Sequence, residues 1–218
     1  MERHFEKSLE ILLAALAEMA AHVDGVLGAA EESLNNHDAS QAEGVFVGEK
    51  EIDLDQNKLD EMILDFIALH QPVASDLRQV LSAQDIVVDL ERIGDHAVNI
   101  AESSVRLSGL RNPPDLLKLP EMAIQARSMV ADSTKSFLTR DPELARRTIA
   151  RDDRMDELNR EMTRLVIAAI KEDRELVETG LELIRISKNL ERIADLSANI
   201  AEDTVFLVEA RTARHQPV

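Results

Sequence analysis

Apolar residues recur every three to four positions through almost the whole chain, which is the period of an amphipathic α-helix. Residues 5–34 carry one such stripe, which includes Leu9, Leu16 and Val23. The same spacing predicts five further helices, over residues 40–69, 72–107, 115–139, 142–171 and 174–210. We therefore predict an all-α protein.

The breaks between these segments carry ordinary helix-ending signals. Gln71-Pro72 ends the second helix, because proline has no backbone N–H and restrains the residue before it. Residues 112–115 read Asn-Pro-Pro-Asp and are the strongest linker signal. Asp141-Pro142-Glu143 combines a capping side chain, a first-turn proline and an early acid, so it predicts a helix start.

The two halves of the chain resemble each other. Leu90-Glu91-Arg92-Ile93 recurs 100 residues later as Leu190-Glu191-Arg192-Ile193, and Asn99-Ile100-Ala101-Glu102 recurs at the same offset. The preceding helices match at an offset of 103, which places Ile52 and Asp53 on Met155 and Asp156. We therefore predict two tandem three-helix bundles related by internal duplication, over residues 1–110 and 111–218.

The composition narrows the functional classes. The 218 residues include 25 Lys and Arg against 42 Asp and Glu, giving a formal net charge of −17. This charge opposes a phosphate backbone, and without Trp or Tyr few rings can stack on bases, so we expect no direct nucleic-acid partner. The absence of Cys excludes disulfides, thiolate metal sites and Cys nucleophiles.

The amino-terminal segment is not typical of a signal peptide, because its charges are mixed and Glu18 interrupts a short apolar run. No stretch approaches 18 uncharged apolar residues, so we expect no transmembrane segment. The simplest interpretation is a cytoplasmic protein.

Acidic residues recur in pairs four positions apart at equivalent places in the two halves. Two carboxylates at this spacing lie one helical turn apart on the same face, where their repulsion costs about 0.2–0.5 kcal/mol. A hard cation would relieve that repulsion, since carboxylate oxygens suit Mg, Ca, Mn and Fe. The candidate metal ligands are Glu49, Asp53, Glu91 and Asp95 in the first half, and Asp152, Asp156, Glu191 and Asp195 in the second.

On a helical wheel, the acids of each helix lie beside its apolar stripe, and they are rotated away from the centre of the stripe in the same direction on both helices of a pair. On antiparallel neighbours such flanks lie on a common side of the helix pair, where they either converge on one groove or both turn away from it. The handedness of the bundle decides between these arrangements. A plain solvated face is the competing interpretation, with Arg92 and Arg192 as partners for nearby acids.

Other chemistry has little support in the sequence. No His has Glu three residues before it, as a ferritin-like di-iron site requires, and no phosphate loop, GxSxG or HExxH motif occurs. His96 has Leu196 as its counterpart, so we expect a surface or interface histidine rather than a repeated ligand. We predict no catalytic residues and no enzyme activity.

Two segments resemble a known family. The run Gln71-Pro72-Val73-Ala74-Ser75-Asp76-Leu77-Arg78, followed by Asp89-Leu90-Glu91-Arg92-Ile93-Gly94-Asp95, strongly resembles the PhoU family, regulators of the phosphate-specific transport system. The second half keeps a looser copy, Asn189-Leu190-Glu191-Arg192-Ile193-Ala194-Asp195, without the first run. Length, duplication and linker fit as well, so the resemblance covers nearly the whole chain.

The resemblance implies a cytoplasmic negative regulator of phosphate uptake and phosphate-starvation signalling. Such a protein is an adaptor between the phosphate ABC transporter, through its ATPase, and a sensor histidine kinase, and is usually a homodimer. The resemblance also implies multinuclear iron or zinc clusters on the eight acids named above; magnesium and manganese are alternatives. Two other functions stay open: a metal-dependent enzyme or metal-storing bundle that uses the carboxylate clusters, and a helical scaffold without metal.

Overall fold

The computed structural model describes residues 2–36, 39–108, 110 and 118–209, and nearly all of them are helical. They contain no strand, which confirms the all-α prediction. The helices are α1 (Glu2–Asn36), α2 (Ala39–His70), α3 (Ser75–Ser108), α4 (Lys118–Thr139), α5 (Pro142–Ile149), α6 (Asp152–Glu172) and α7 (Val177–Glu209), with a 3₁₀ turn at Arg174–Leu176 before α7.

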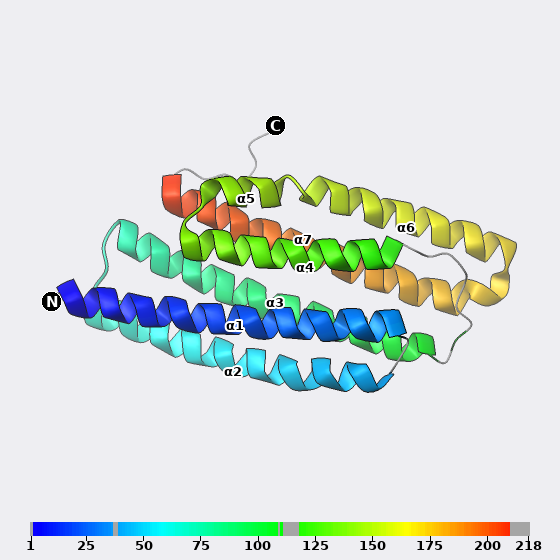
Figure 1. The fold of residues 1–218 in the computed structure, drawn as a ribbon, viewed down its shortest axis with the longest axis horizontal. Helices are drawn as coiled ribbons and strands as arrows, with labels where there is room; N and C mark the ends of the chain where they lie inside the picture. The colour runs from blue at the N-terminus through cyan, green and yellow to red at the C-terminus, as the bar shows by residue number, and fades with distance from the viewer. Residues whose placement is uncertain (1, 37–38, 109, 111–117, 210–218) are drawn as a thin grey trace.

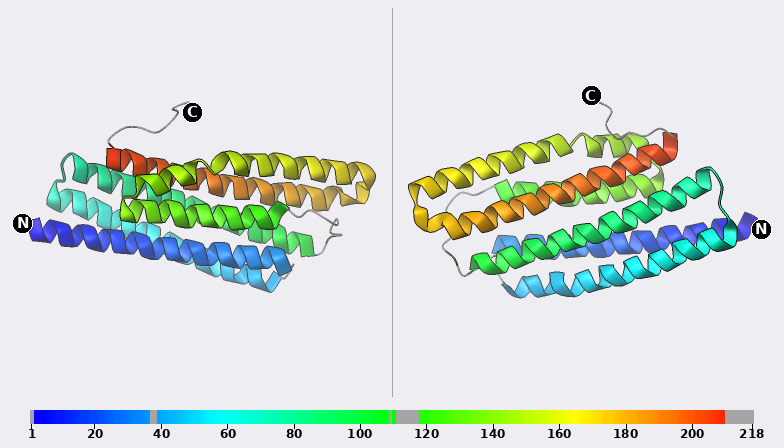
Figure 2. Two further views of the ribbon diagram at one scale, coloured as in Figure 1. Left: turned by 45° about the horizontal axis from the view of Figure 1, so that its top comes forward. Right: turned by 180° about the vertical axis from the view of Figure 1, so that it is seen from behind.

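The helices form two bundles that lie side by side along the length of the molecule (Figure 1). Helices α1, α2 and α3 make the first bundle, and α4, α5 with α6, and α7 make the second. Seen from behind, α3 and α7 are antiparallel neighbours at the centre, with α2 beyond α3 and α6 beyond α7 (Figure 2). On the other face, α1 packs against α4. The predicted tandem three-helix bundles are confirmed, with the fifth predicted helix divided in two.

Equivalent buried hydroxyl pairs mark the duplication. In the first bundle Ser33 Oγ of α1 donates to Ser104 Oγ of α3 at 3.1 Å. In the second, Ser136 Oγ of α4 donates to Thr204 Oγ1 of α7, also at 3.1 Å. These residues follow their counterparts by 103 and 100 positions, the two offsets found in the sequence.

One apolar core runs through both bundles. Ile52 and Ile93 and their counterparts Met155 and Ile193 are fully buried and belong to the same cluster of core residues. Shared burial explains why the bundles lie against each other along α3, α7, α1 and α4. The predicted boundary at residues 110 and 111 adjoins residues 111–117, which lie outside the described part, so it stays a prediction together with the linker at 112–115.

The predicted continuous helix over residues 142–171 is wrong, because the chain breaks at Ala150 and Arg151. Their ψ angles are −12° and −15°, flatter than in an α-helix, so the helix axis changes direction there. Contacts with α4 hold the break: Arg151 Nη1 donates to Asp132 Oδ2 at 2.7 Å, and Gln125 Nε2 donates to the Arg151 carbonyl at 3.2 Å. The helix start predicted at Asp141 is confirmed, since its carboxylate accepts hydrogen bonds from the backbone of Glu143 and Leu144.

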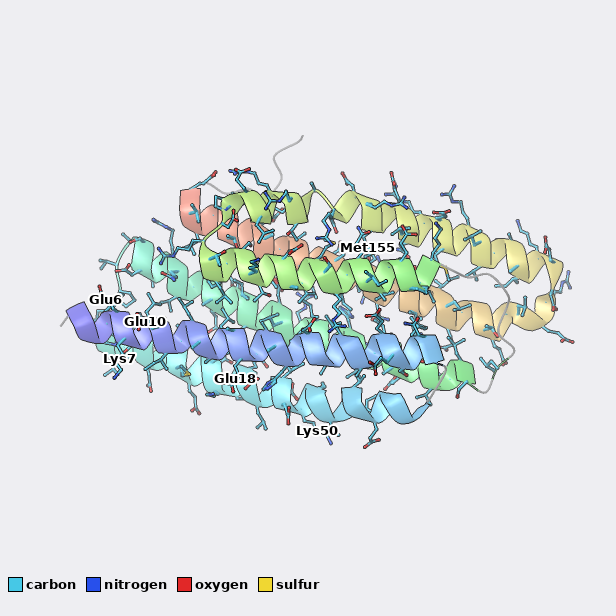
Figure 3. All side chains as sticks on the ribbon, viewed as in Figure 1. Glu6, Lys7, Glu10, Glu18, Lys50 and Met155 are labelled. Carbon is cyan, nitrogen blue, oxygen red and sulfur yellow. The ribbon has the colours of Figure 1, made fainter. Side chains whose placement is uncertain are left out.

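Helix α1 has a surface side and a core side. In Figure 3, Glu6, Glu10 and Glu18 lie along its outer surface, whereas residues such as Leu16 and Val23 are fully buried. The stretch Phe5–Asn35 is one helix whose length and hydropathy would allow it to cross a membrane. Core helices that pack against their neighbours meet the same criterion, as α1 does here against α2, α3 and α4.

Candidate functional site: two carboxylate clusters

The first cluster lies between α2 and α3 and consists of Glu49, Asp53, Glu91 and Asp95. Partial burial, followed by the charges of Asp53 and Asp95, raises the pKa of the Glu49 carboxyl. Burial, then Asp95 and Asp53, likewise raises the pKa of Glu91. The pKa of each glutamate is therefore raised by the charge of an aspartate on the facing helix, which shows that the two flanks converge.

The second cluster lies between α6 and α7 and consists of Asp152, Asp156, Glu191 and Asp195. Burial, then the charges of Asp195 and Asp156, raises the pKa of Asp152 to about 6. Burial and then Glu191 raise the pKa of Asp195, also to about 6. This cluster is the more buried of the two, because Glu191 is only 7% exposed.

The structure thus decides what the helical wheel left open, since the acids in each half turn towards one groove. The local reason is the fully buried stripe on each helix. Ile52 and Ile93 point into the core of the first bundle, and the acids next to them lie at the edge of the contact between α2 and α3. At Gly94 a Cβ would lie 3.1 Å from Ile52 Cδ1, so the two helices approach closely beside the cluster.

The second cluster also contains acceptor atoms that no side chain satisfies. Asp152 Oδ1 and Glu191 Oε2 are buried and accept no hydrogen bond. Buried carboxylate oxygens without a partner are costly, and a cation is one group that could satisfy them. The donor set, four carboxylates in each groove, therefore fits a hard cation by its chemistry.

A ready-made coordination sphere is not present in the described part of the chain. There, no set of three or more Asp, Glu or His side chains is arranged to hold a metal ion. Binding would require the carboxylates to close around the ion, which exposed side chains such as Asp53 and Asp95 can do by changing rotamer. Metal binding by the eight predicted ligands stays a prediction.

Two basic side chains at the second cluster were not among the residues predicted from the sequence. Lys188 forms an ion pair with Glu191, and Arg160 Nη2 lies 3.3 Å from Asp156 Oδ2. The sequence spacing could have indicated both pairs, because each basic residue lies three or four positions from its acid on the same helix.

His96 of α3 is the expected interface histidine: its Nδ1 is 2.9 Å from Asn189 Oδ1 on α7.

The raised pKa values predict an unusual response to pH. The folded protein holds the protons of Asp152 and Asp195 more tightly than the unfolded chain does, since their pKa is about 6 in place of 3.8. This contribution to stability is fully present below the unfolded pKa of 3.8, decreases as the pH rises above it, and is lost once the pH has passed through about 6. In a chelator, we expect the unfolding free energy to fall by about 1–2 kcal/mol between pH 5 and 7 from this source, after allowance for solvent screening.

Urea unfolding followed by circular dichroism would measure this response. The Asp152→Asn/Asp195→Asn variant should lose much of the pH dependence. The control is Asp65→Asn/Asp85→Asn, which removes two exposed carboxylates outside both clusters and therefore corrects for net charge. An equal pH response in the two variants would contradict the prediction.

Both halves of the chain match a known domain. The model of the PhoU domain matches residues 16–104 and again residues 119–204. The chain is 31% identical over 208 residues to the phosphate-specific transport system accessory protein PhoU homologue of Clostridium acetobutylicum, covering 95% of each chain. It is 35% identical over 214 residues to the homologue of Aquifex aeolicus, covering 97% of this chain and 96% of that one.

Solved structures agree with the sequence matches. PhoU from Pseudomonas aeruginosa superposes with a TM-score of 0.92 at 29% identity, over 95% of this chain and all of that chain. The phosphate transport system regulatory protein PhoU from Streptococcus pneumoniae gives a TM-score of 0.89 at 26% identity, over 97% of this chain and all of that chain. The similarity therefore extends over the whole architecture.

Proposed function

Because this chain belongs to the PhoU family, we propose that it is an accessory regulator of phosphate transport and not an enzyme. The observation that carries the proposal is the match of both halves, over nearly the full length, to proteins named for the phosphate-specific transport system. In finer detail, the protein is a negative regulator in the cytoplasm, an adaptor between the ATPase of the phosphate ABC transporter and a sensor histidine kinase. It acts as a homodimer.

The two carboxylate clusters are part of this proposal. Each groove holds one or more cations, iron or zinc or else magnesium or manganese, through Glu49, Asp53, Glu91 and Asp95 in the first cluster and Asp152, Asp156, Glu191 and Asp195 in the second. A bound cation would neutralise charges that repel one another across the grooves between α2 and α3 and between α6 and α7. The bound cation would thereby stabilise the packing of the two neighbouring helices.

A pull-down tests the adaptor function directly. The purified full chain is presented to the transporter ATPase and to the cytoplasmic part of the sensor kinase, with a chelator and with added metal. We expect both partners to be retained, and the Asp95→Asn/Asp195→Asn variant reports whether retention depends on metal. If neither partner is retained under any condition, the adaptor function is wrong. Metal that exchanges freely without any reaction would favour the adaptor over a metal-dependent enzyme or store.

A further inference from the structure

The two bundles expose apolar side chains at equivalent positions. In the first bundle, Leu64 of α2 is 67% exposed and Leu81 of α3 is 48% exposed. Their counterparts at the offsets of 103 and 100 are Ile167 of α6, which is 45% exposed, and Leu181 of α7, which is 56% exposed. A single exposed apolar residue is normal on a protein surface, but a pair that recurs at equivalent places indicates a surface that a partner covers.

The two leucines of the first bundle lie across from each other on neighbouring helices. Gln84 Nε2 of α3 donates to Asp60 Oδ1 of α2 at 2.7 Å, which fixes the register of the two helices at this point. Leu64 and Leu81 lie one turn further along the same sides of these helices. The two leucines, the first apolar patch, therefore lie in the groove between α2 and α3.

The second apolar patch, Ile167 and Leu181, has the same arrangement between α6 and α7. A Cβ at Gly180 of α7 would lie 2.8 Å from Val166 Cγ1 of α6, so the two helices approach closely beside this pair. The α2–α3 connection and the α6–α7 connection lie at opposite ends of the molecule (Figure 2). Because each patch lies near its own connection, the two patches are separate surfaces.

The charges around the two patches differ. Within four residues of the first patch the chain has four acids and one basic residue, namely Asp60, Glu61, Asp65, Asp85 and Arg78. Within four residues of the second it has three basic residues and two acids, namely Arg164, Lys171, Arg185, Glu178 and Glu182. The connections beyond add Asp76 to the first patch, and Glu172, Asp173, Arg174 and Glu175 to the second. The first patch has the more negative surroundings with or without the connections.

The groove that holds the first patch is also acidic further along. It continues to the first carboxylate cluster, whose four acids outnumber the neighbouring Lys50 and Arg92. A helix laid in the groove over Leu64 and Leu81 would therefore meet acids along its whole length. Its apolar side would cover the leucines, and lysine or arginine on its other sides would face the acids.

We propose that the first apolar patch is the docking surface for a basic amphipathic helix of a partner protein. A membrane of anionic lipid or a nucleic acid fits poorly, because the net charge of −17 repels both. A second copy of the chain carries the same net charge, and the surroundings of its second patch are too nearly balanced to complement the acids of the first. The proposal rests on the proposed function, in which an adaptor contacts protein partners.

Fluorescence anisotropy of synthetic peptides measures the binding. The probe is a labelled amphipathic helix with leucine on one side and lysine on the other, and a peptide with glutamate in place of lysine is its counterpart. The full chain is titrated in a chelator, so that cations do not compete for the acids. We expect one lysine peptide to bind per chain, about tenfold or more tightly than the glutamate peptide.

Matched variants locate the bound peptide. Leu64→Gln/Leu81→Gln removes the apolar contact and keeps every charge, so it should weaken binding of the lysine peptide about tenfold. The control is Ile167→Gln/Leu181→Gln, which makes the same change in the second patch and should leave the binding unchanged. All four side chains are exposed, and circular dichroism checks that both variants are folded.

A change of charge tests why the peptide selects the first patch. Arg164→Glu/Ala168→Asp gives the second patch the charges that Glu61 and Asp65 give the first, at equivalent positions. We expect this variant to bind two lysine peptides per chain with similar affinities. If it still binds one, the selection of the first patch by charge is wrong.

The remaining outcomes also decide the matter. If Leu64→Gln/Leu81→Gln binds the lysine peptide as well as the parent does, the acids alone attract it and the docking surface is wrong. If that variant changes the sedimentation of the free protein instead, a second copy covers the patch and the proposal is also wrong. If the peptides behave as expected but the pull-down retains neither partner, the adaptor function is wrong while the docking surface stands.

The same variant in the pull-down connects the docking surface to the adaptor function. Leu64→Gln/Leu81→Gln should lose one of the two partners, whereas Ile167→Gln/Leu181→Gln should retain it. If both variants retain both partners as the parent does, the adaptor function stands and the first apolar patch is not the surface that it uses.

Discussion

Replacing Asp95 and Asp195 together by Asn should remove most of the thermal stabilisation that metal gives the protein. A cation that binds only the folded state stabilises it by about 2.7 kcal/mol when its free concentration is a hundredfold above the dissociation constant. For a chain of this size that corresponds to roughly 5–10 °C in melting temperature. Each substitution keeps the side-chain shape and removes one charge from its own cluster, so we expect the metal-dependent shift to shrink sharply.

The metal-free variant should behave in the opposite way. Asp195 has its pKa raised to about 6 by burial and by Glu191, so its charge is unfavourable at pH 7. Asparagine removes that charge, and the variant should stay folded or gain stability in a chelator. The measurement is the melting temperature of parent and variant with and without iron, zinc or magnesium. Asp65→Asn/Asp85→Asn is the control, because it removes the same number of carboxylates outside the clusters. If metal raises the melting temperature of all three proteins equally, the acids of the clusters are only solvent-exposed side chains that bind no metal.

Alanine at Gly48 and at Gly25 should change stability in opposite directions, although both positions lie within helices. A Cβ at Gly48 of α2 would lie 2.5 Å from Cγ2 of Val26 on α1, closer than atoms can pack. Val26 is 4% exposed and β-branched, so its side chain has little freedom to rotate away. We expect Gly48→Ala to destabilise the fold by about 1–2 kcal/mol, because the overpacking exceeds the gain in helix propensity.

Gly25 of α1 has open space where its Cβ would lie, with no atom within 4 Å. Gly25→Ala should therefore stabilise by about 0.5–1 kcal/mol through helix propensity alone. Urea unfolding compares the two variants. The Val26→Ala/Gly48→Ala variant provides the room for the added methyl, so its destabilisation should be less than the sum of the single changes. Additive effects would argue against the close approach of α1 and α2 at this point.

That close approach also bears on the candidate site, since Gly48 directly precedes Glu49 of the first cluster. A shift of α2 away from α1 would alter the distance between Glu49 and the acids of α3. Gly48→Ala should therefore lower stability and also weaken cation binding by the first cluster. A Mn²⁺ titration of Gly48→Ala in an Asp156→Asn/Asp195→Asn background, which leaves only the first cluster intact, would detect the weaker binding. The second cluster, carried by α6 and α7, should be unaffected.

Much of the fold followed from local sequence alone. The helical period, the cap at Asp141 and the duplication were all visible, because an amphipathic stripe and a capping side chain depend on residues within one or two turns of each other. The equivalence of the four acid pairs was also a property of the sequence. So was the pairing of Lys188 with Glu191, since the two residues lie three positions apart on one helix.

Only the tertiary structure decided how these helices meet. The break at Ala150 and Arg151 contains neither Gly nor Pro, and contacts with Asp132 and Gln125 of α4 hold it in place. Arg127 of α4 reaches Asp24 of α1, 103 residues away, with two hydrogen bonds of 2.7 and 2.8 Å that no local pattern indicates. Above all, the convergence of the acids on two grooves depends on the handedness of each bundle, which packing between distant segments determines and a helical wheel cannot.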